Sequence, residues 1–131
     1  GQDLLSVDMP WLGSHALLLK QCAFEALESL LTPHGELLPV PCSPKLWVFN
    51  PTCILDALDE SASKLVRFSS GRLMWVDSYE FREQVVATAS VFKLPNFRAS
   101  PTFFSHEIVR QIKSLGVTGL DFTLVWKSRD V

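Results

Sequence analysis

The sequence predicts an α+β fold in which two main helices, at about 14–31 and 105–115, pack against a mostly antiparallel sheet. Apolar residues recur at helical spacing in both of those segments, which indicates amphipathic helices. Short segments with the character of strands lie between them, and the turn Ser70-Gly71 joins two of these as a hairpin. The strands of a hairpin pair antiparallel, so most of the sheet is expected to be of that kind.

The N-terminal third is expected to contain an irregular lead, a helix and two strands. Residues 1–13 are predicted to be irregular because Pro10 interrupts any apolar pattern. Ser14 is placed to cap the first helix. Two strands are predicted after that helix, at 36–40 and 45–49. The helix is expected to bury one apolar stripe, made of Leu19, Ala23, Leu27 and Leu30.

The middle of the chain is expected to form a short helix and the hairpin. Asn50 can cap a helix over 51–60, since Pro51 suits the first helical position. The hairpin strands are predicted at 64–69 and 72–81. Four residues of the second strand are expected to share one face, namely Leu73, Trp75, Tyr79 and Phe81. Shorter elements are predicted as one helical turn at 82–86 and extended segments at 91–94 and 102–104.

The C-terminal segment has the clearest pattern. Ser105 is a good N-cap for the helix at 105–115, and Gly116 fits the position after the helix end, where positive φ is needed. A strand then alternates apolar residues with others. Its buried face is expected to carry Leu120, Phe122, Leu124 and Trp126.

Length and composition predict one globular domain over 1–131. Of the 131 residues, 47% are hydrophobic and 20% are charged. The net charge of −2 is too small to indicate a nucleic-acid or membrane partner. Three cysteines without a C-x-x-C pair argue against a disulfide framework and for a reducing, cytoplasmic location.

The sequence contains no recognisable catalytic or metal-binding motif. The histidines His15, His34 and His106 lie far apart, and closely spaced zinc ligands are absent. There is also no Gly-rich phosphate loop, so neither a metal nor a cofactor is predicted. A Cys–His pair could still assemble in space, for instance Cys22 with His34, and so could a pair of carboxylates. A small cytosolic enzyme is therefore the alternative class of protein.

Three acidic residues form a candidate interaction cluster. Asp56, Asp59 and Glu60 are spaced so that they would share one side of the predicted helix at 51–60. An acidic patch of this kind would meet a basic surface on a partner and speed association. The alternative is an ordinary solvated face, neutralised by Lys64 or Arg67.

Six segments follow one another in the order of a known family. They are G-E-L-L-P-V at 35–40, W-V-F-N-P-T at 47–52, I-L-D-A-L-D-E-S-A-S-K-L-V-R-F-S-S-G-R-L-M at 54–74, Y-E-F-R at 79–82, V-F-K-L-P at 91–95 and the ending S-H-E…G-V-T-G-L-D-F. In this order they resemble a family of bacterial immunity proteins from polymorphic toxin systems, the eleventh numbered immunity family. Members of that family usually carry more chain at the N-terminus. This chain starts at Gly1 without a Met, as a truncated immunity-protein-like domain would.

The resemblance implies a cytoplasmic protein that binds a cognate bacterial toxin and neutralises it by occlusion, without catalysis. The expected partner is then a protein, and neither a nucleic acid nor a membrane. A regulatory or assembly domain that only self-associates is a third possibility. Aromatic anchors and acidic steering charges are expected at the partner-binding face, and the candidates are Trp11, Trp47, Tyr79, Asp56, Asp59 and Glu60.

Overall fold

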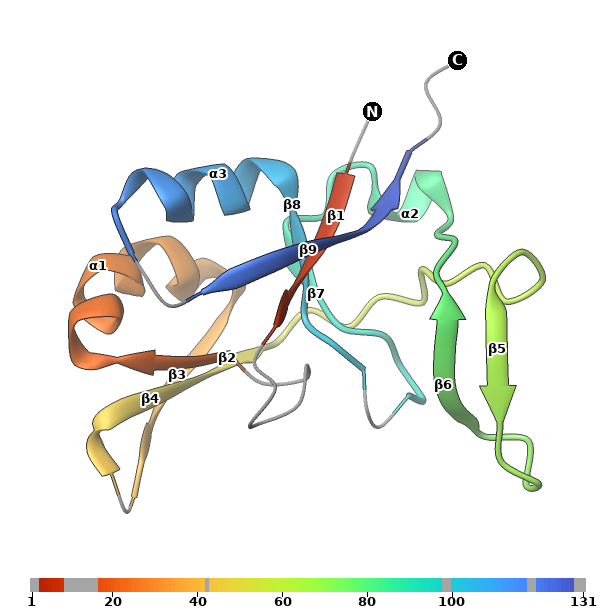
Figure 1. Cartoon of the computed structure of the whole chain (residues 1–131), viewed down its shortest axis with the longest axis horizontal. Coiled ribbons are helices and arrows are strands. Elements are labelled where there is room, and N and C mark those ends of the chain that lie inside the picture. The colour runs from red at the N-terminus through yellow and green to blue at the C-terminus, as the bar shows by residue number, and fades with distance from the viewer. Residues whose placement is uncertain (1–2, 9–16, 42, 98–99, 118–119, 129–131) are drawn as a thin grey trace.

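The computed structural model describes residues 3–8, 17–41, 43–97, 100–117 and 120–128. Its fold is α+β, and the predicted class is confirmed (Figure 1). The elements are, in chain order, β1 (Asp3–Asp8), β2 (Leu17–Lys20), α1 (Gln21–Leu31), the 3-10 helix η1 (Thr32–His34), β3 (Gly35–Val40), β4 (Ser43–Pro51), β5 (Lys64–Arg67), β6 (Leu73–Ser78), α2 (Glu83–Val86), β7 (Val91–Phe92), β8 (Phe103–Ser105), α3 (His106–Ser114) and β9 (Asp121–Lys127).

Within the described ranges the strands form three antiparallel sheets. Their strand orders are β7-β8-β1-β9, β2-β4-β3 and β5-β6. Figure 1 shows β5 and β6 as a separate hairpin at one end of the molecule, and α1 with the three-stranded sheet at the other end. The predicted hairpin around Ser70-Gly71 is confirmed, and Gly71 adopts the positive φ of 91° that such a turn needs.

The prediction of an irregular lead over 1–13 is wrong for Asp3–Asp8. These residues form β1, which lies between β8 and β9 in the four-stranded sheet. Leu4 is opposite Ser105 on one side and Trp126 on the other. The partners of β1 come from the far end of the chain, so the neighbouring residues in the sequence carry little sign of the strand.

The first main helix begins at Gln21 and not near residue 14. Leu17–Lys20 is the strand β2, which pairs with β4, and Ser14 lies outside the described residues. Leu17 and Leu19 are both fully buried, as they would be on the inner side of a helix as well. A short apolar run such as that at 17–19 fits a helix or a strand equally well, and here it is a strand because it pairs with β4. The rest of the predicted stripe is helical. Ala23 and Leu27 are buried as expected, but at the end of the helix Leu31 is the buried leucine and the predicted Leu30 is only half-buried.

The helix predicted over 51–60 is wrong, because Pro51 is the last residue of the strand β4 and no helix follows it over 52–60. The residues after Pro51 have no regular structure apart from isolated bridges at Ile54 and Leu58, and their backbone bonds to distant parts of the chain. The amide of Leu55 donates to the carbonyl of Lys93 at 3.0 Å, and the amide of Arg82 donates to the carbonyl of Ala57 at 2.7 Å. These long-range bonds satisfy backbone groups that a helix would have satisfied locally, so the proline signal at residue 51 did not decide the structure.

The second main helix is confirmed, at His106–Ser114. Ser105 Oγ accepts a hydrogen bond from the amide of Ile108 at 3.2 Å, as an N-cap should, and Gly116 has φ 73°. The single buried face predicted for the following strand is only partly correct. Trp126 is buried, whereas Leu124 is half exposed, because the register with β1 shifts between them and leaves Val125 as an extra residue.

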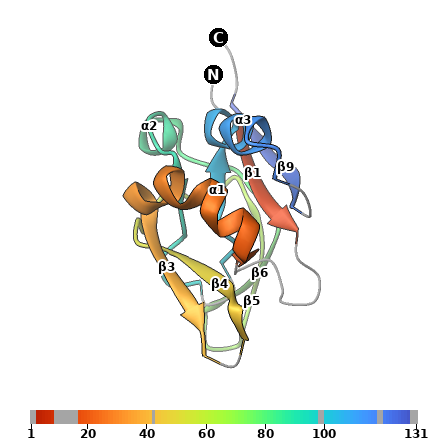
Figure 2. The same ribbon diagram turned by 90° about the vertical axis from the view of Figure 1, so that its left-hand side faces the viewer.

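Two apolar clusters form the core. In the first, α1 and α3 lie next to each other and pack with β2, β4 and the middle of the four-stranded sheet (Figure 2). In the second, the hairpin packs its inner side on the aromatic rings of Phe81, Phe92 and Phe103. Among the described residues, no helix has the length and apolar character needed to cross a membrane.

Candidate functional site

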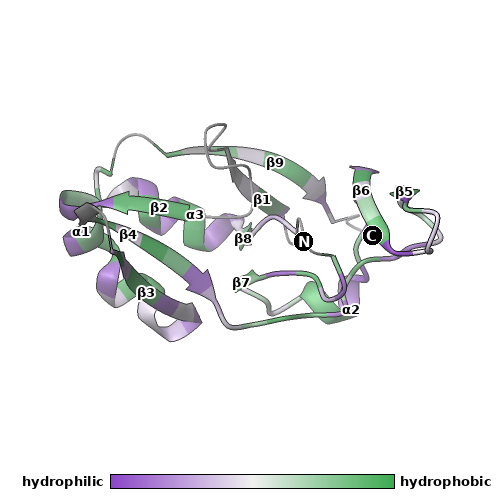
Figure 3. Cartoon of the chain, turned by 90° about the horizontal axis from the view of Figure 1, so that it is seen from below, coloured by the Kyte–Doolittle hydropathy of each residue, from purple (hydrophilic) through white to green (hydrophobic). Residues whose placement is uncertain are grey.

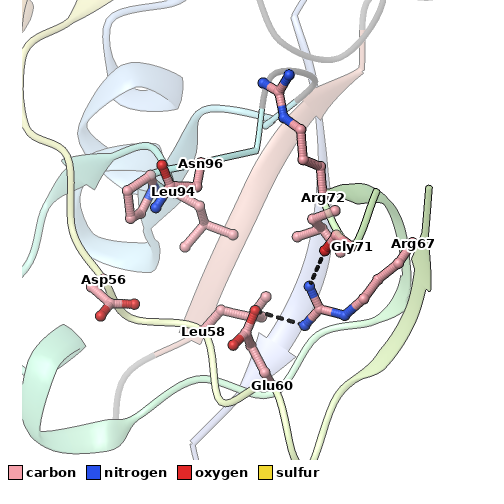
Figure 4. Close-up of a pocket in the computed structure, with 10 residues that line it drawn as sticks. Asp56, Leu58, Glu60, Arg67, Gly71, Arg72, Leu94 and Asn96 are labelled. Carbon is pink, nitrogen blue, oxygen red and sulfur yellow. Dashed lines mark hydrogen bonds and ion pairs between the residues drawn. The ribbon is translucent and has the colours of Figure 1, made fainter. Parts of the chain in front are cut away.

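An open hollow of about 510 Å³ lies between the hairpin and two neighbouring segments of the chain. One wall is the inner side of the hairpin, a second is the extended segment before β5, and a third is the loop after β7 (Figure 4). The residues that line it are Asp56, Leu58, Glu60, Arg67, Gly71, Arg72, Leu73, Leu94, Pro95 and Asn96. The tertiary structure therefore gathers both charge signs and several apolar side chains at one end of the molecule.

Arg67 is the central charge of the hollow. Its guanidinium donates to Glu60 Oε1 at 2.9 Å and to the carbonyl oxygen of Gly71 at 3.0 Å. Figure 4 shows Arg72 extending away from this pair. Within the described chain, Arg72 has no ion pair, so its charge remains available to a partner. The sequence already pointed to Arg67 as one residue that could neutralise the acids.

The three predicted acids do not share a helix face. Asp56 and Glu60 line the hollow, and each lies near an arginine: Asp56 Oδ2 is 3.9 Å from Arg82 and Glu60 is paired with Arg67. Both carboxylate side chains are largely exposed, at 78% and 57%. Pairs this exposed contribute little to stability, so the two carboxylates can exchange partners when another charged surface approaches.

Asp59 has a local structural role. Its Oδ1 accepts from the Ser61 hydroxyl at 2.8 Å and from the amide of Ala62 at 3.2 Å, which closes the turn before β5. The Ser61 hydroxyl and then the Ala62 amide hold the pKa of Asp59 below its usual value. Asp59 is absent from the residues that line the hollow, so the structure separates it from Asp56 and Glu60.

The predicted aromatic anchors are less free than expected. Trp47 stacks on Phe24 with ring centroids 3.9 Å apart, and its Nε1 donates to Gln21 at 3.1 Å. Tyr79 is half-buried between Phe81 and Phe103, at centroid distances of 5.7 and 5.2 Å. Trp11 lies outside the described residues.

A different tryptophan is exposed. The sequence placed Trp75 on one face with Leu73 and Phe81, but Trp75 is 51% exposed whereas Val76 is buried. The pairing of β5 with β6 shifts register at Met74, which changes the side to which the neighbouring residues point. The hairpin was predicted correctly, yet nothing in the sequence marks the bulge, and so the exposed aromatic residue was missed.

A second hollow, of about 420 Å³, brings His34 and Cys53 together. This is a spatial Cys–His combination of the kind considered from the sequence, although Cys22, the cysteine named there, is instead exposed on α1. No hydrogen bond joins the imidazole and the thiol in the described chain, and a nucleophile–base pair would need one. The described residues contain no group of three or more His, Cys, Asp or Glu that could hold a metal ion.

Fold and site together define a small α+β domain with an open, mixed-charge hollow beside an exposed apolar hairpin. The model of the Immunity protein family (Imm11) matches residues 40–127, which is more than half of the chain, and so the protein belongs to that family. The resemblance seen in the ordered sequence segments is thereby confirmed. No curated protein matches the chain.

Proposed function

We propose that this protein is a cytoplasmic immunity protein that binds a cognate bacterial toxin and neutralises it by covering the toxin's surface, without catalysis. Its membership of the Immunity protein family (Imm11) is the observation that carries this proposal. The longest segment of the resemblance, at 54–74, includes most of the residues that line the hollow and most of the hairpin. It lies within the matched residues 40–127, which supports a role for this region in the proposed binding.

The titratable groups support a binding role over a catalytic one. Among the described residues, three groups have shifted pKa values: Asp59, Tyr79 and Lys93. The hydrogen bond from Ser61 lowers the pKa of Asp59. Burial raises the pKa of Tyr79 and lowers the pKa of Lys93. These three groups lie on separate segments of the chain, and none of them lines the large hollow. Acid–base catalysis needs perturbed groups that converge on a single cavity, whereas recognition does not.

Asp56 and Glu60 are the proposed steering charges. Both carboxylates are exposed at the rim of the hollow and would attract cationic groups of a basic toxin surface. Asp59 would contribute indirectly, by holding the turn that presents Glu60. Of the proposed aromatic contacts, Trp47 and Tyr79 offer only partly exposed rings, and the contribution of Trp11 remains a prediction.

The test is a pair of assays with the toxin encoded beside this chain. The two proteins should co-purify, and cells that express the toxin should grow when this chain is co-expressed. An unrelated toxin is the control for specificity, and this chain carrying a frameshift is the control for rescue. If the wild-type chain neither binds the neighbouring toxin nor restores growth, the proposed function is wrong.

The shared hollow of His34 and Cys53 supports one alternative, a small enzyme that protects the cell by chemistry. The variants Cys53→Ala and His34→Ala separate the two possibilities. Under the binding proposal both variants keep toxin binding and growth rescue. If both bind the toxin as tightly as the wild type but no longer rescue growth, the protein is a catalyst instead.

A further inference from the structure

Exposed apolar side chains concentrate on the β5–β6 hairpin. The large hydrophobic residues that are exposed in the described chain number eight, and four of them fall on this hairpin. They are Val66, Phe68, Met74 and Trp75, which we call the hairpin patch. Exposed large apolar residues scattered singly are ordinary, but a cluster on one short element is typical of an interaction site.

The geometry of the hairpin explains why Val66 and Trp75 are uncovered. Val66 is directly opposite Trp75, so their side chains point to the same side of the two-stranded sheet. Leu65 is opposite Val76, and this pair points to the other side, into the second core cluster. Neither strand is hydrogen-bonded to another sheet in the described residues, and Figure 3 shows the hairpin at the end opposite α1. One side of the hairpin therefore belongs to the core, and no other strand or helix of the described part of the chain covers the opposite side at Val66 and Trp75.

The charges of the hairpin restrict what can cover it. Residues 64–78 contain three cations, Lys64, Arg67 and Arg72, and one anion, Asp77, although the whole chain has a net charge of −2. Arg67 is bound to Glu60, but Lys64 and Arg72 have no ion pair within the described residues. The surface that fits this element is apolar at its centre and carries carboxylates at its edge.

A second copy of the chain fits poorly. A two-fold contact would place the hairpin patch against itself and would bring Lys64 and Arg72 close to the same cations of the other copy. Like charges that face each other across an interface disfavour association. A nucleic acid also fits poorly, since the chain as a whole has a net charge of −2 and a nucleic-acid site is usually marked by a basic domain.

We propose that the hairpin patch, with Trp75 at its centre, inserts into an apolar recess of the cognate toxin whose rim carries carboxylates that pair with Arg72 and Lys64. This inference rests on the proposed function and adds the element that docks and the chemistry of the surface that receives it. Tryptophan is among the residues that most often dominate binding at the centre of an interface. Arg72 lines the same hollow as the acids Asp56 and Glu60, so the toxin surface that meets this hollow would carry both charge signs, and their arrangement would set the orientation of the toxin.

The experiment measures binding of the purified toxin domain encoded beside this chain, by surface plasmon resonance at two salt concentrations. Trp75→Ala and Phe68→Ala should each raise Kd by about 30-fold or more, mainly through faster dissociation. Arg72→Glu should slow association by about 10-fold and weaken its dependence on salt.

Matched controls come from the other elements. Leu115→Ala and Leu124→Ala truncate side chains that are as exposed as those of the patch, and Lys20→Glu reverses an exposed cation at the opposite end of the molecule. All three should change Kd by less than about 3-fold, as expected for residues outside an interface. Thermal unfolding confirms that each variant is folded. If Trp75→Ala does not fold, Phe68→Ala and Arg72→Glu decide the question, because both residues are exposed outside the core.

Several results would overturn the inference. If the wild-type chain binds the toxin and rescues growth, and the hairpin variants do the same with unchanged Kd, the docking face is elsewhere and the proposed function stands. If the wild-type chain fails to bind and to rescue, both proposals are wrong. Dimers in sedimentation velocity that Trp75→Ala abolishes would assign the patch to a second copy. Binding of a single-stranded oligonucleotide that Trp75→Ala abolishes would assign it to nucleic acid.

Discussion

Tyr79 should make the stability of this protein fall steeply at high pH. Its ring is half-buried against Phe81 and Phe103, and burial raises the pKa of its phenol from 10.0 to about 12. Below pH 10 the phenol is neutral in both the folded and the unfolded chain, and the shift has no effect. Between pH 10 and 12 the unfolded chain releases this proton and the folded chain retains it. The free energy of unfolding therefore falls as pH rises, by about 1.4 kcal/mol per pH unit and roughly 2–3 kcal/mol in all.

The assay is direct because Tyr79 is the one tyrosine in the sequence. Tyrosinate absorbance near 295 nm should have its midpoint near pH 12 in the folded protein and near pH 10 in denaturant. Urea unfolding of the wild type and of Tyr79→Phe isolates the contribution of the Tyr79 phenol to stability, because the two proteins contain the same lysines and differ only in this group. The two proteins should have the same free energy of unfolding at pH 8, and above pH 10 the wild type should become less stable than Tyr79→Phe. A tyrosinate midpoint near pH 10 in the folded protein would refute the burial of this ring.

Three substitutions test the packing directly. Gly35→Ala should destabilise the protein by about 3 kcal/mol, because a Cβ at this position would lie 2.3 Å from the backbone oxygen of Asn50. Thr102→Val should stabilise it by about 1 kcal/mol, because the buried Thr102 hydroxyl has no hydrogen-bond partner within the described residues. Ser105→Ala should cost about 1 kcal/mol, since the amide of Ile108 loses its N-cap acceptor.

Urea unfolding measures all three effects, and each has its own control. Gly71→Ala is the control for the clash at Gly35, since a Cβ at residue 71 meets no atom within 4 Å and only the positive φ of 91° opposes it. Thr102→Ser retains the hydroxyl and should not stabilise the protein. Ser105→Thr retains the capping oxygen and should restore most of the lost stability. The packing described at each residue would be contradicted if Gly35→Ala or Ser105→Ala left the free energy of unfolding unchanged, or if Thr102→Val lowered it.

The candidate site could be predicted only in pieces. The sequence identified Asp56 and Glu60 as exposed acids and Arg67 as one of two cations that could neutralise them, and the structure joins Glu60 to Arg67. The helix assumed over 51–60 was wrong, and with it the idea that Asp59 would lie on the same side as the other two acids. Short-range spacing assigned a face to these residues, whereas hydrogen bonds to the distant residues Lys93 and Glu80 determined their real conformation.

The sequence also could not show which of the candidate aromatic residues are exposed. Residue type suggests that a tryptophan or tyrosine can anchor an interface, but it does not tell which rings are covered. Trp47 is held by Phe24 and Gln21, and Tyr79 by two phenylalanines, while Trp75 is left exposed. Each of these outcomes depends on contacts between elements that are separate in the sequence.

The sequence by itself determined the elements whose signals are local. The helix at His106–Ser114 has its own cap in Ser105 and its own terminating Gly116, and the β5–β6 hairpin has its own glycine turn. The resemblance to an immunity protein family was also readable from the order of short segments, and the match over 40–127 confirms it. The helix and the hairpin depend on residues within a few positions of one another, and the resemblance depends only on the order of such short segments along the chain.

Only the tertiary structure decided where the two ends of the chain meet and which face of the hairpin is bare. β1 is a strand because β8 and β9 flank it, and Leu17–Lys20 is a strand because β4 pairs with it. The extra residues Met74 and Val125 turned neighbouring side chains to the opposite side of their strands. A strand satisfies its backbone through another segment, so its existence and its register are properties of the pair and cannot be read from either segment alone.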